Sequence, residues 1–340
     1  MRRRALIAAT TLLAAPRLAL AQASWPERPI SLVVPFTPGG STDIAARIIA
    51  ERLAPRLGPN ARLVIENRAG AGGSLGADVV KRANPDGHTL LVATASSHGT
   101  NPAALPQTTP YDALEDFSSI AILGGGPMVI VVPGRSRFRS IQDLIAAMRA
   151  EPGRLSFATS GAGGIGHLTG EYFMARAGRA NGVQAGGAGG PLRSEHIPYR
   201  GGAQVLAAMA AGEVDWSCEV LASAAPHLRD GTSRGLAITG RTRHPLMPDL
   251  PTLAESGLTD FDVTTWNMLL GPKNLPAALT TRLNEAVNAT LAEPQVRERM
   301  ANAGVDAAAP NTPAEARAFL AAELAKFRDI VRVAGIALGR

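Results

Sequence analysis

Short apolar runs and amphipathic stretches alternate along the first third of the chain. Residues 30–34 form an apolar run between two prolines, which is typical of a buried strand. Residues 42–57 carry apolar side chains near one face of a helix and end at Gly58, a residue type that commonly follows a helix. The same pattern predicts strands at residues 62–66 and 89–94 and a helix at residues 77–83. Strands that alternate with helices favour βα units and a mainly parallel sheet.

The pattern starts again at residue 128. Strands are predicted at residues 128–132, 155–159, 195–198, 214–218 and 235–239, with helices at residues 141–150, 167–177 and 202–211 between them. Two further helices, at residues 276–293 and 312–333, close the chain. Two separate βα series predict two α/β lobes. Residues 181–191 are glycine-rich and uncharged, which favours a surface insertion.

The first segment has a different pattern. Met1 is followed by three arginines and an apolar run to Ala15, and Ala19-Leu20-Ala21 fits a small-x-small cleavage site. This layout predicts a secretory signal peptide over residues 1–21, because the apolar run is too short to span a bilayer. A basic first helix of a cytosolic protein is the alternative, and the paired arginines leave the twin-arginine export route open.

Composition narrows the function classes. Lys and Arg number 34 against 28 Asp and Glu, and arginines are concentrated in the first segment, so the exported chain is nearly neutral. Charges of both signs are interspersed and aromatic residues make up only 4%, which argues against nucleic-acid binding. A single cysteine, Cys218, excludes a disulfide framework and a cysteine metal site. No later segment has the length of a membrane span, so we expect a soluble exported protein.

The first candidate site lies where the strand at residues 30–34 passes into a helix. The sequence of residues 35–43 is Pro-Phe-Thr-Pro-Gly-Gly-Ser-Thr-Asp. Glycines let successive N–H groups point into one space, and the N-terminus of a helix favours an anion such as a carboxylate or phosphate. Asp43 is expected to fill part of the anion's role, to pair with Arg47, or to accept from a ligand. An ordinary capped turn is the alternative.

The second candidate site mirrors the first in the other series. Gly161, Gly163 and Gly166 spell G-x-G-x-x-G between a predicted strand and a predicted helix. This is also the dinucleotide-binding fingerprint, but the acidic residue expected about 20 positions later is missing. A second carboxylate-binding helix start, with Ser160 and His167 as further donors, therefore fits the pattern better.

Two other enzyme signals are weaker. Residues 72–76 match the nucleophile elbow G-x-S-x-G, but a loop separates them from the preceding strand, and no histidine has an evident orienting acid. The histidines also lack the i, i+4 spacing of a helical zinc site. A hydrolase and a metal site are both disfavoured.

Together these segments resemble one family. Residues 35–47 look like the P-F-x-x-G-G-x-x-D-x-x-x-R signature of the tripartite tricarboxylate transporter substrate-binding proteins, the Bug family. The resemblance covers residues 25–335 in order and is carried further by residues 66–73, 84–90, 160–168, 197–202, 211–215 and 248–257 and by the strand that contains Trp266.

The resemblance implies a type II periplasmic binding protein, or Venus flytrap. One lobe would span residues 25–125 plus 250–340 and the other residues 126–249, each a mainly parallel sheet flanked by helices. The family pattern implies a monomeric periplasmic protein that closes on a small carboxylated solute. It would deliver this solute to a membrane permease of one small and one large subunit. We expect no cofactor, no metal and no catalysis.

The family pattern also implies the ligand contacts. One carboxylate would meet the loop at residues 36–43, and the other end of the solute would meet residues 160–167. The implied contacts are Phe36, Thr37, Gly39, Gly40, Ser41, Asp43, Ser96, Ser160, Gly161, Gly163, Gly164, Gly166, His167, Tyr199, Gly201 and Asp215.

Two departures from the family pattern affect the far end of the site. The insertion at residues 181–191 lengthens one loop, and Cys218-Glu219 stands where the family usually has an apolar residue and then Asp. An exported dehydrogenase or hydrolase, or a ligand-presenting partner of a sensor, is the alternative function.

Overall fold

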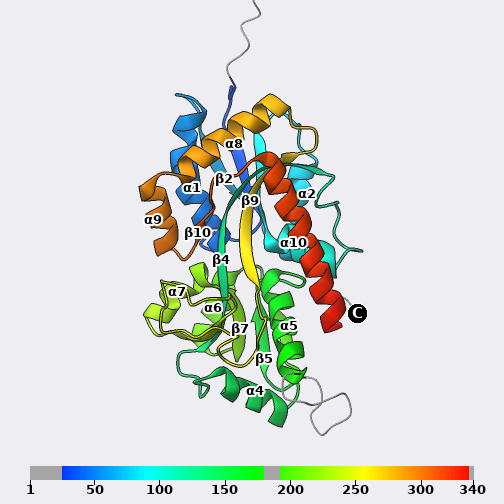
Figure 1. Cartoon of the computed structure of the whole chain (residues 1–340), viewed down its shortest axis with the longest axis vertical. Coiled ribbons are helices and arrows are strands. Elements are labelled where there is room, and N and C mark those ends of the chain that lie inside the picture. The colour runs from blue at the N-terminus through cyan, green and yellow to red at the C-terminus, as the bar shows by residue number, and fades with distance from the viewer. Residues whose placement is uncertain (1–24, 180–191, 337–340) are drawn as a thin grey trace, which may run out of the picture.

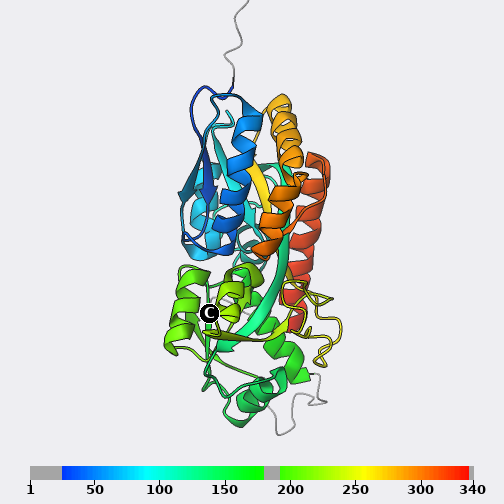
Figure 2. The same ribbon diagram turned by 90° about the vertical axis from the view of Figure 1, so that its left-hand side faces the viewer.

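Two α/β lobes are stacked along the long axis of the computed structural model, which describes residues 25–179 and 192–336 (Figure 1). A view from the side shows the same two lobes and the strands that join them (Figure 2). The predicted signal peptide at residues 1–21 and the predicted insertion at residues 181–191 lie outside the described residues. No described helix is both long and apolar enough to cross a membrane.

The first lobe is built on three parallel strands. β1 pairs with β2 on one side and with β3 on the other. The strands of this lobe are β1 (Ile30–Val34), β2 (Leu63–Asn67) and β3 (Thr89–Thr94). Its helices are α1 (Ser41–Leu57), α2 (Ser74–Lys81), α3 (Asn101–Ala104), α8 (Ala277–Leu291), α9 (Pro294–Asn302) and α10 (Pro313–Ala334), with the short turns η1 (Ala71–Gly73) and η2 (Ala95–Thr100).

The second lobe repeats this plan. β5 pairs in parallel with β6 and with β7, and the helices lie around them (Figure 1). The strands are β5 (Ser156–Thr159), β6 (Glu195–Pro198), β7 (Trp216–Val220) and β8 (Ser233–Ile238). The helices are α4 (Ile141–Ala150), α5 (Ile165–Arg179), α6 (Gly202–Ala211) and α7 (Leu221–Arg229).

Two long antiparallel strands join the lobes. β4 (Phe117–Pro133) pairs with β9 (Thr264–Pro272) through its first part and with β7 and β8 through its last residues. β10 (Asp306–Ala307) adds a short pairing at Gly124 and Gly125. The chain therefore leaves the first lobe along β4 and returns along β9.

The return crossing comes later than the predicted lobe boundary at residue 250. The Gln142 side chain donates to Ser256 O (3.0 Å), and Arg176 donates to Thr259 O (2.6 Å), so this stretch lies beside the second lobe. It carries short turns that bury Leu253 and Phe261 against that lobe's core. β9, not residue 250, marks the return.

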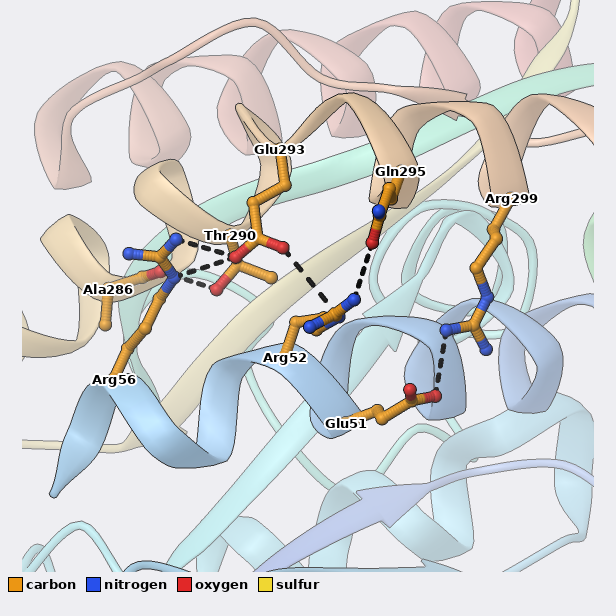
Figure 3. Close-up of polar contacts among 8 residues, drawn as sticks. All are labelled: Glu51, Arg52, Arg56, Ala286, Thr290, Glu293, Gln295 and Arg299. Atoms are coloured by element: carbon orange, nitrogen blue, oxygen red, sulfur yellow. Dashed lines mark hydrogen bonds and ion pairs between the residues drawn. The ribbon is translucent and has the colours of Figure 1, made fainter. Parts of the chain in front are cut away.

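The apolar face of α1 is buried and its other face is held by charged side chains. Ile49, Leu53 and Leu57 are buried in the core of the first lobe. Figure 3 shows arginines and acids that connect the exposed face of α1 with the end of α8 and with α9. The closest contacts are Arg56 with Glu293 (2.6 Å), Arg52 with Gln295 (2.6 Å) and Arg299 with Glu51 (2.9 Å). These contacts connect α1 with α8 and α9, and the N-terminus of α1 faces the other lobe.

Candidate functional site

A small cavity of about 40 Å³ lies between the lobes, at the ends of β1, β3 and β7. This volume holds no more than a few water molecules, so the lobes are closed on each other. The cavity is lined by Phe36, Gly40, Ser41, Thr42, Thr94, Ser96, Ser160, Ile165, Gly202, Glu219, Val220, Ser223 and Thr265. The N-termini of α1, α5 and α6 all contribute to this wall.

The N-terminus of α1 presents free N–H groups to the cavity. Gly39 takes a positive φ of 80° that turns the chain after β1, and Gly40 then precedes the helix without a side-chain cap. The N–H groups of Ser41 and Thr42 have no acceptor among the described residues, as expected for a first helical turn. Because these donors stand at the positive end of the helix dipole, they suit an anion.

Asp43 does not face the cavity but holds this loop in shape. Its carboxylate accepts from Gly39 N (3.0 Å), Arg47 Nε (2.9 Å) and Asn67 Nδ2 (2.9 Å), and Asn67 also donates to Phe36 O (3.0 Å). Burial alone would raise the pKa of Asp43, but these three hydrogen bonds hold it below its usual value. Of the roles expected for Asp43, the structure shows the pairing with Arg47.

The start of α5 differs from the start of α1 at its first helical N–H group, which is already bonded to the other lobe. Ile165 N donates to Ser96 Oγ across the lobes (2.9 Å), Gly163 N donates to His167 Nδ1 (3.1 Å), and Gly164 N donates to Gly161 O (3.2 Å). A second bond between the lobes runs from Thr100 Oγ1 to Gly163 O (2.6 Å). Three consecutive N–H groups of the second candidate site therefore have partners within the protein.

A second cavity of about 320 Å³ lies next to the first. Phe36 and Ser160 line both cavities, while Gly161 and Tyr199 line the larger one alone. Its remaining walls come from both lobes, from residues 70–74 and 101–109 on one side and residues 198–200 on the other. We call the smaller cavity the inner cavity and the larger one the outer chamber.

Seven of the sixteen predicted contact residues line the two cavities. Phe36, Gly40, Ser41, Ser96 and Ser160 line the inner cavity. Thr37 and Gly201 touch across the lobes, and a Cβ on Gly164 would lie 3.5 Å from Ser96 Oγ.

Gly166, His167 and Asp215 are among the predicted residues that line neither cavity. A Cβ on Gly166 would lie 2.7 Å from Cys218 O, so this glycine lets α5 pack closely on β7. The His167 ring stacks on His196 at 3.6 Å between ring centroids, and burial lowers the pKa of His167 to about 3. Asp215 precedes β7, at the opposite end from the cavity, where it accepts from Ser156 N (2.8 Å). These contacts all lie within the second lobe.

Several cavity residues carry no signal in the sequence. Thr94, Val220, Ser223 and Thr265 were not predicted, because each belongs to a different element and only the fold brings them together. The sequence did single out Glu219, because this residue departs from the family pattern. It is buried and is the sole charged residue of the inner wall.

The enzyme motifs lack catalytic geometry. Ser74, the serine of the G-x-S-x-G match, contacts Asn101 Nδ2 (2.8 Å) and the Tyr111 hydroxyl (3.3 Å), with neither a histidine nor an acid among its partners. Among the described residues, no group of three or more His, Cys, Asp or Glu side chains could hold a metal ion.

Comparison with known proteins decides the family. The model of the tripartite tricarboxylate transporter family receptor, TctC, matches residues 45–336. BugT of Bordetella pertussis (strain Tohama I) is 33% identical over 315 residues, which are 93% of this chain and 92% of BugT. The chain belongs to the TctC receptor family. The match spans both lobes and both crossing strands of the receptor.

Solved structures of similar proteins share the receptor's fold. The periplasmic binding protein BugD is 30% identical, with a TM-score of 0.82 over 92% of this chain and 99% of BugD. R. palustris Rpa4515 with adipate is 31% identical, with a TM-score of 0.84 over 92% of this chain and 99% of its own. MatC from Rhodopseudomonas palustris with bound malate is 29% identical, with a TM-score of 0.82 over 90% of this chain and all of its own. The expected two-lobed periplasmic binding protein fold is confirmed.

Proposed function

We propose that this receptor binds a small carboxylate-bearing solute between its lobes and delivers it to the membrane subunits of a tripartite tricarboxylate transporter. The observation that carries the proposal is the uncapped N-terminus of α1, whose Ser41 and Thr42 line a closed cavity between the lobes. Backbone N–H groups and hydroxyls are sufficient to hold a carboxylate at such a helix end.

Two kinds of comparison support a carboxylate. The chain belongs to a family of transporter receptors, and two similar structures hold adipate and malate, both of which carry two carboxylates. The inner cavity alone is too small for either molecule, so we expect the lobes to part on loading and to close around the solute together with part of the outer chamber.

The cellular setting follows from the same family. The similar protein BugD is a periplasmic binding protein, and the first residues of this chain have the pattern of a signal peptide. We therefore propose export to the periplasm with cleavage after Ala21, action as a monomer without catalysis, and a permease of one small and one large subunit. N-terminal sequencing of the exported protein tests the cleavage, because a chain that begins at Met1 would contradict it.

Calorimetric titration of the exported chain with adipate, malate and related acids tests binding. We expect at least one carboxylate to bind and to raise the melting temperature by several degrees at saturation. Recovery of the acid unchanged after incubation is expected of a binder, whereas turnover would indicate an enzyme.

One substitution tests the place of binding. Gly40→Leu adds a side chain to the inner wall, and the φ of −76° at Gly40 accommodates it without backbone strain. We expect this variant to fold and to lose binding at least a hundredfold. Gly178→Leu, on α5 and outside both cavities, is the matched control and should bind normally. Unchanged binding by Gly40→Leu would show that the solute binds elsewhere.

A further inference from the structure

Glu219 is a buried acid on the wall of a cavity proposed to bind an acid. Only 3% of this residue is exposed, and it lies near the end of β7 with its carboxyl at the inner cavity. The inner wall contains no Lys, Arg or His. A buried carboxylate without a cation is costly, so this site needs either a proton or a hydrogen-bond donor from the solute.

The hydrogen bonds around Glu219 leave its carboxyl short of donors. Ser217 Oγ lies 3.2 Å from Glu219 Oε1 and is its sole hydrogen-bond partner among the described residues. The same hydroxyl donates to Ala158 O at 2.7 Å. A serine hydroxyl has one hydrogen, and the shorter bond to Ala158 competes for it, so Ser217 is a weak donor to Glu219.

Ser223, the other nearby hydroxyl, is also occupied. Ser223 Oγ donates to Val220 O (3.0 Å). A Cβ on Gly202 would lie 2.7 Å from Glu219 Oε2, so the start of α6 approaches this oxygen closely without donating to it. Glu219 Oε2 therefore remains open to a group that enters the cavity.

Other titratable groups on neighbouring elements do not compensate Glu219. Asp43 on α1 is turned toward Arg47, and His167 on α5 is stacked on His196. Cys218 precedes Glu219 on β7, and burial raises the pKa of its thiol, so it stays neutral. From β4 the facing residue is Val129. Burial raises the pKa of Glu219 to about 7, even though the hydrogen bond with Ser217 acts in the opposite direction.

The two ends of the inner cavity thus have opposite chemistry. The α1 end offers the N–H groups of Ser41 and Thr42, while at the α5 end the N–H of Ile165 is bonded to Ser96 and Glu219 offers an acceptor. We infer that Glu219 selects a solute with a carboxylate at one end and a hydrogen-bond donor at the other, and that a dicarboxylate binds only together with a proton. This inference rests on the proposed function, because it assigns the second end of the same site.

Two series of solutes of equal length test the inference. Succinate, succinamate and 4-aminobutanoate form the first series, and adipate, adipamate and 6-aminohexanoate form the second. Each series keeps one carboxylate and changes only the other end. At pH 8.5 we expect the amide or the ammonium compound to bind at least tenfold more tightly than the dicarboxylate of the same length.

The pH dependence gives a second readout. Affinity for the dicarboxylate should fall about tenfold for each pH unit above 7, because binding takes up a proton from a solution whose proton concentration falls as the pH rises. Calorimetric titrations in phosphate and in Tris buffers, which differ in ionisation enthalpy, measure the number of protons exchanged on binding. They should report uptake of about one proton per dicarboxylate bound. Affinity for the ammonium compound should not fall over the range from pH 7 to pH 8.5.

Glu219→Gln keeps the shape of the side chain and removes its charge. This variant should lose at least tenfold in affinity for the ammonium compound, and its dicarboxylate affinity should become independent of pH. Glu171→Gln is the matched control, because burial also raises the pKa of Glu171 but this residue lies on α5 outside both cavities. The control should behave as the unchanged protein does.

The outcomes separate the two proposals. One outcome would overturn the role of Glu219 and leave the proposed function in place. In that outcome the dicarboxylates bind as strongly as the amide and ammonium compounds at pH 8.5, take up no proton, and bind equally well to Glu219→Gln. If no member of either series binds at any pH, both proposals are wrong.

Discussion

The loops that begin α1 and α5 look alike in sequence and differ in the folded protein. Each follows a strand, contains two or more glycines and leads into a long helix. At α1 the first-turn N–H groups of Ser41 and Thr42 are free, whereas at α5 the N–H of Ile165 is bound to Ser96 of the other lobe. A glycine-rich helix start therefore predicts that several N–H groups point into one space. Tertiary contacts decide whether these groups remain free to bind a ligand.

The largest expected effect comes from Asp43, which shapes the α1 end. Asp43→Ala leaves Gly39, Arg47 and Asn67 without their acceptor, and we expect a loss of about 4 kcal/mol in the free energy of unfolding, together with weaker solute binding. Denaturant unfolding measures the loss. Asp78→Ala breaks another Asp–Arg pair at the same i, i+4 spacing on an exposed surface and should cost less than about 1 kcal/mol. Equal losses would contradict the shaping role of Asp43.

The contribution of Asp43 to the free energy of unfolding also depends on pH in a defined direction. Its pKa is lowered in the folded protein, so the stabilisation is present above the usual pKa of an aspartate and is lost as the pH falls through the lowered value. The difference between the native chain and Asp43→Ala should therefore shrink in acid. A difference that stays constant down to pH 2 would contradict this account.

Glu219 should affect stability in the opposite direction. Its pKa is raised from 4.5 to about 7, so the unliganded protein loses stability as the pH rises through that interval. The free energy of unfolding of Glu219→Gln should not fall in this way. The difference in free energy of unfolding between the variant and the native chain should therefore be up to about 3 kcal/mol larger at pH 8 than at pH 4. Unfolding curves at pH 4, 6 and 8 measure the change. Parallel pH profiles for the two proteins would show that folding does not raise the pKa of Glu219.

Ser96 tests whether the α5 end is occupied by the other lobe. Ser96→Ala removes the acceptor of Ile165 N–H, and we expect a cost of about 1 kcal/mol to the closed form and faster hydrogen exchange at Ile165. Ser118→Ala removes a similar acceptor, that of Leu275 N–H, within the first lobe. The control should leave exchange at Ile165 unchanged. No change in the Ser96 variant would mean that this bond does not hold the lobes closed.

The smallest effect is expected at the far end of α1. Arg56→Ala removes the contact with Glu293 shown in Figure 3, and partly exposed pairs of this kind contribute little, so the loss should be no more than about 1 kcal/mol. Solute affinity should not change. A change in affinity would indicate that the direction of α1 depends on this pair.

The sequence predicts the parts of the fold that repeat a local pattern. The strand predicted at residues 30–34 is β1, and the predicted helix at residues 202–211 is α6, because apolar periodicity and flanking glycines are local signals. The turns at residues 95–104 and the helix α9 were not predicted. Their positions depend on packing against α10 and α1, which lie far away in the sequence.

The candidate site was predictable only in part for the same reason. The loop at residues 36–43 carries its own signal in its glycines and its helix start. Asp43 and His167 were expected near the solute because they lie in these motifs, but their side chains bind neighbouring residues instead. Asp215 was expected there by family resemblance, and it lies at the wrong end of β7. Asp215 precedes its strand, whereas the ligands of parallel sheets meet the carboxyl ends of the strands.

Gly124, Gly125 and Gly126 stand side by side where β4 leaves the first lobe. A Cβ on Gly124 would meet Asp306 O, and one on Gly125 would meet Thr265 O, so the strands at the waist touch through main chain alone. The joint between the lobes therefore requires glycine at these positions, while the walls of the cavity consist of exchangeable side chains. Descendants of such a chain can acquire a new solute by changing those walls without rebuilding the movement that captures it.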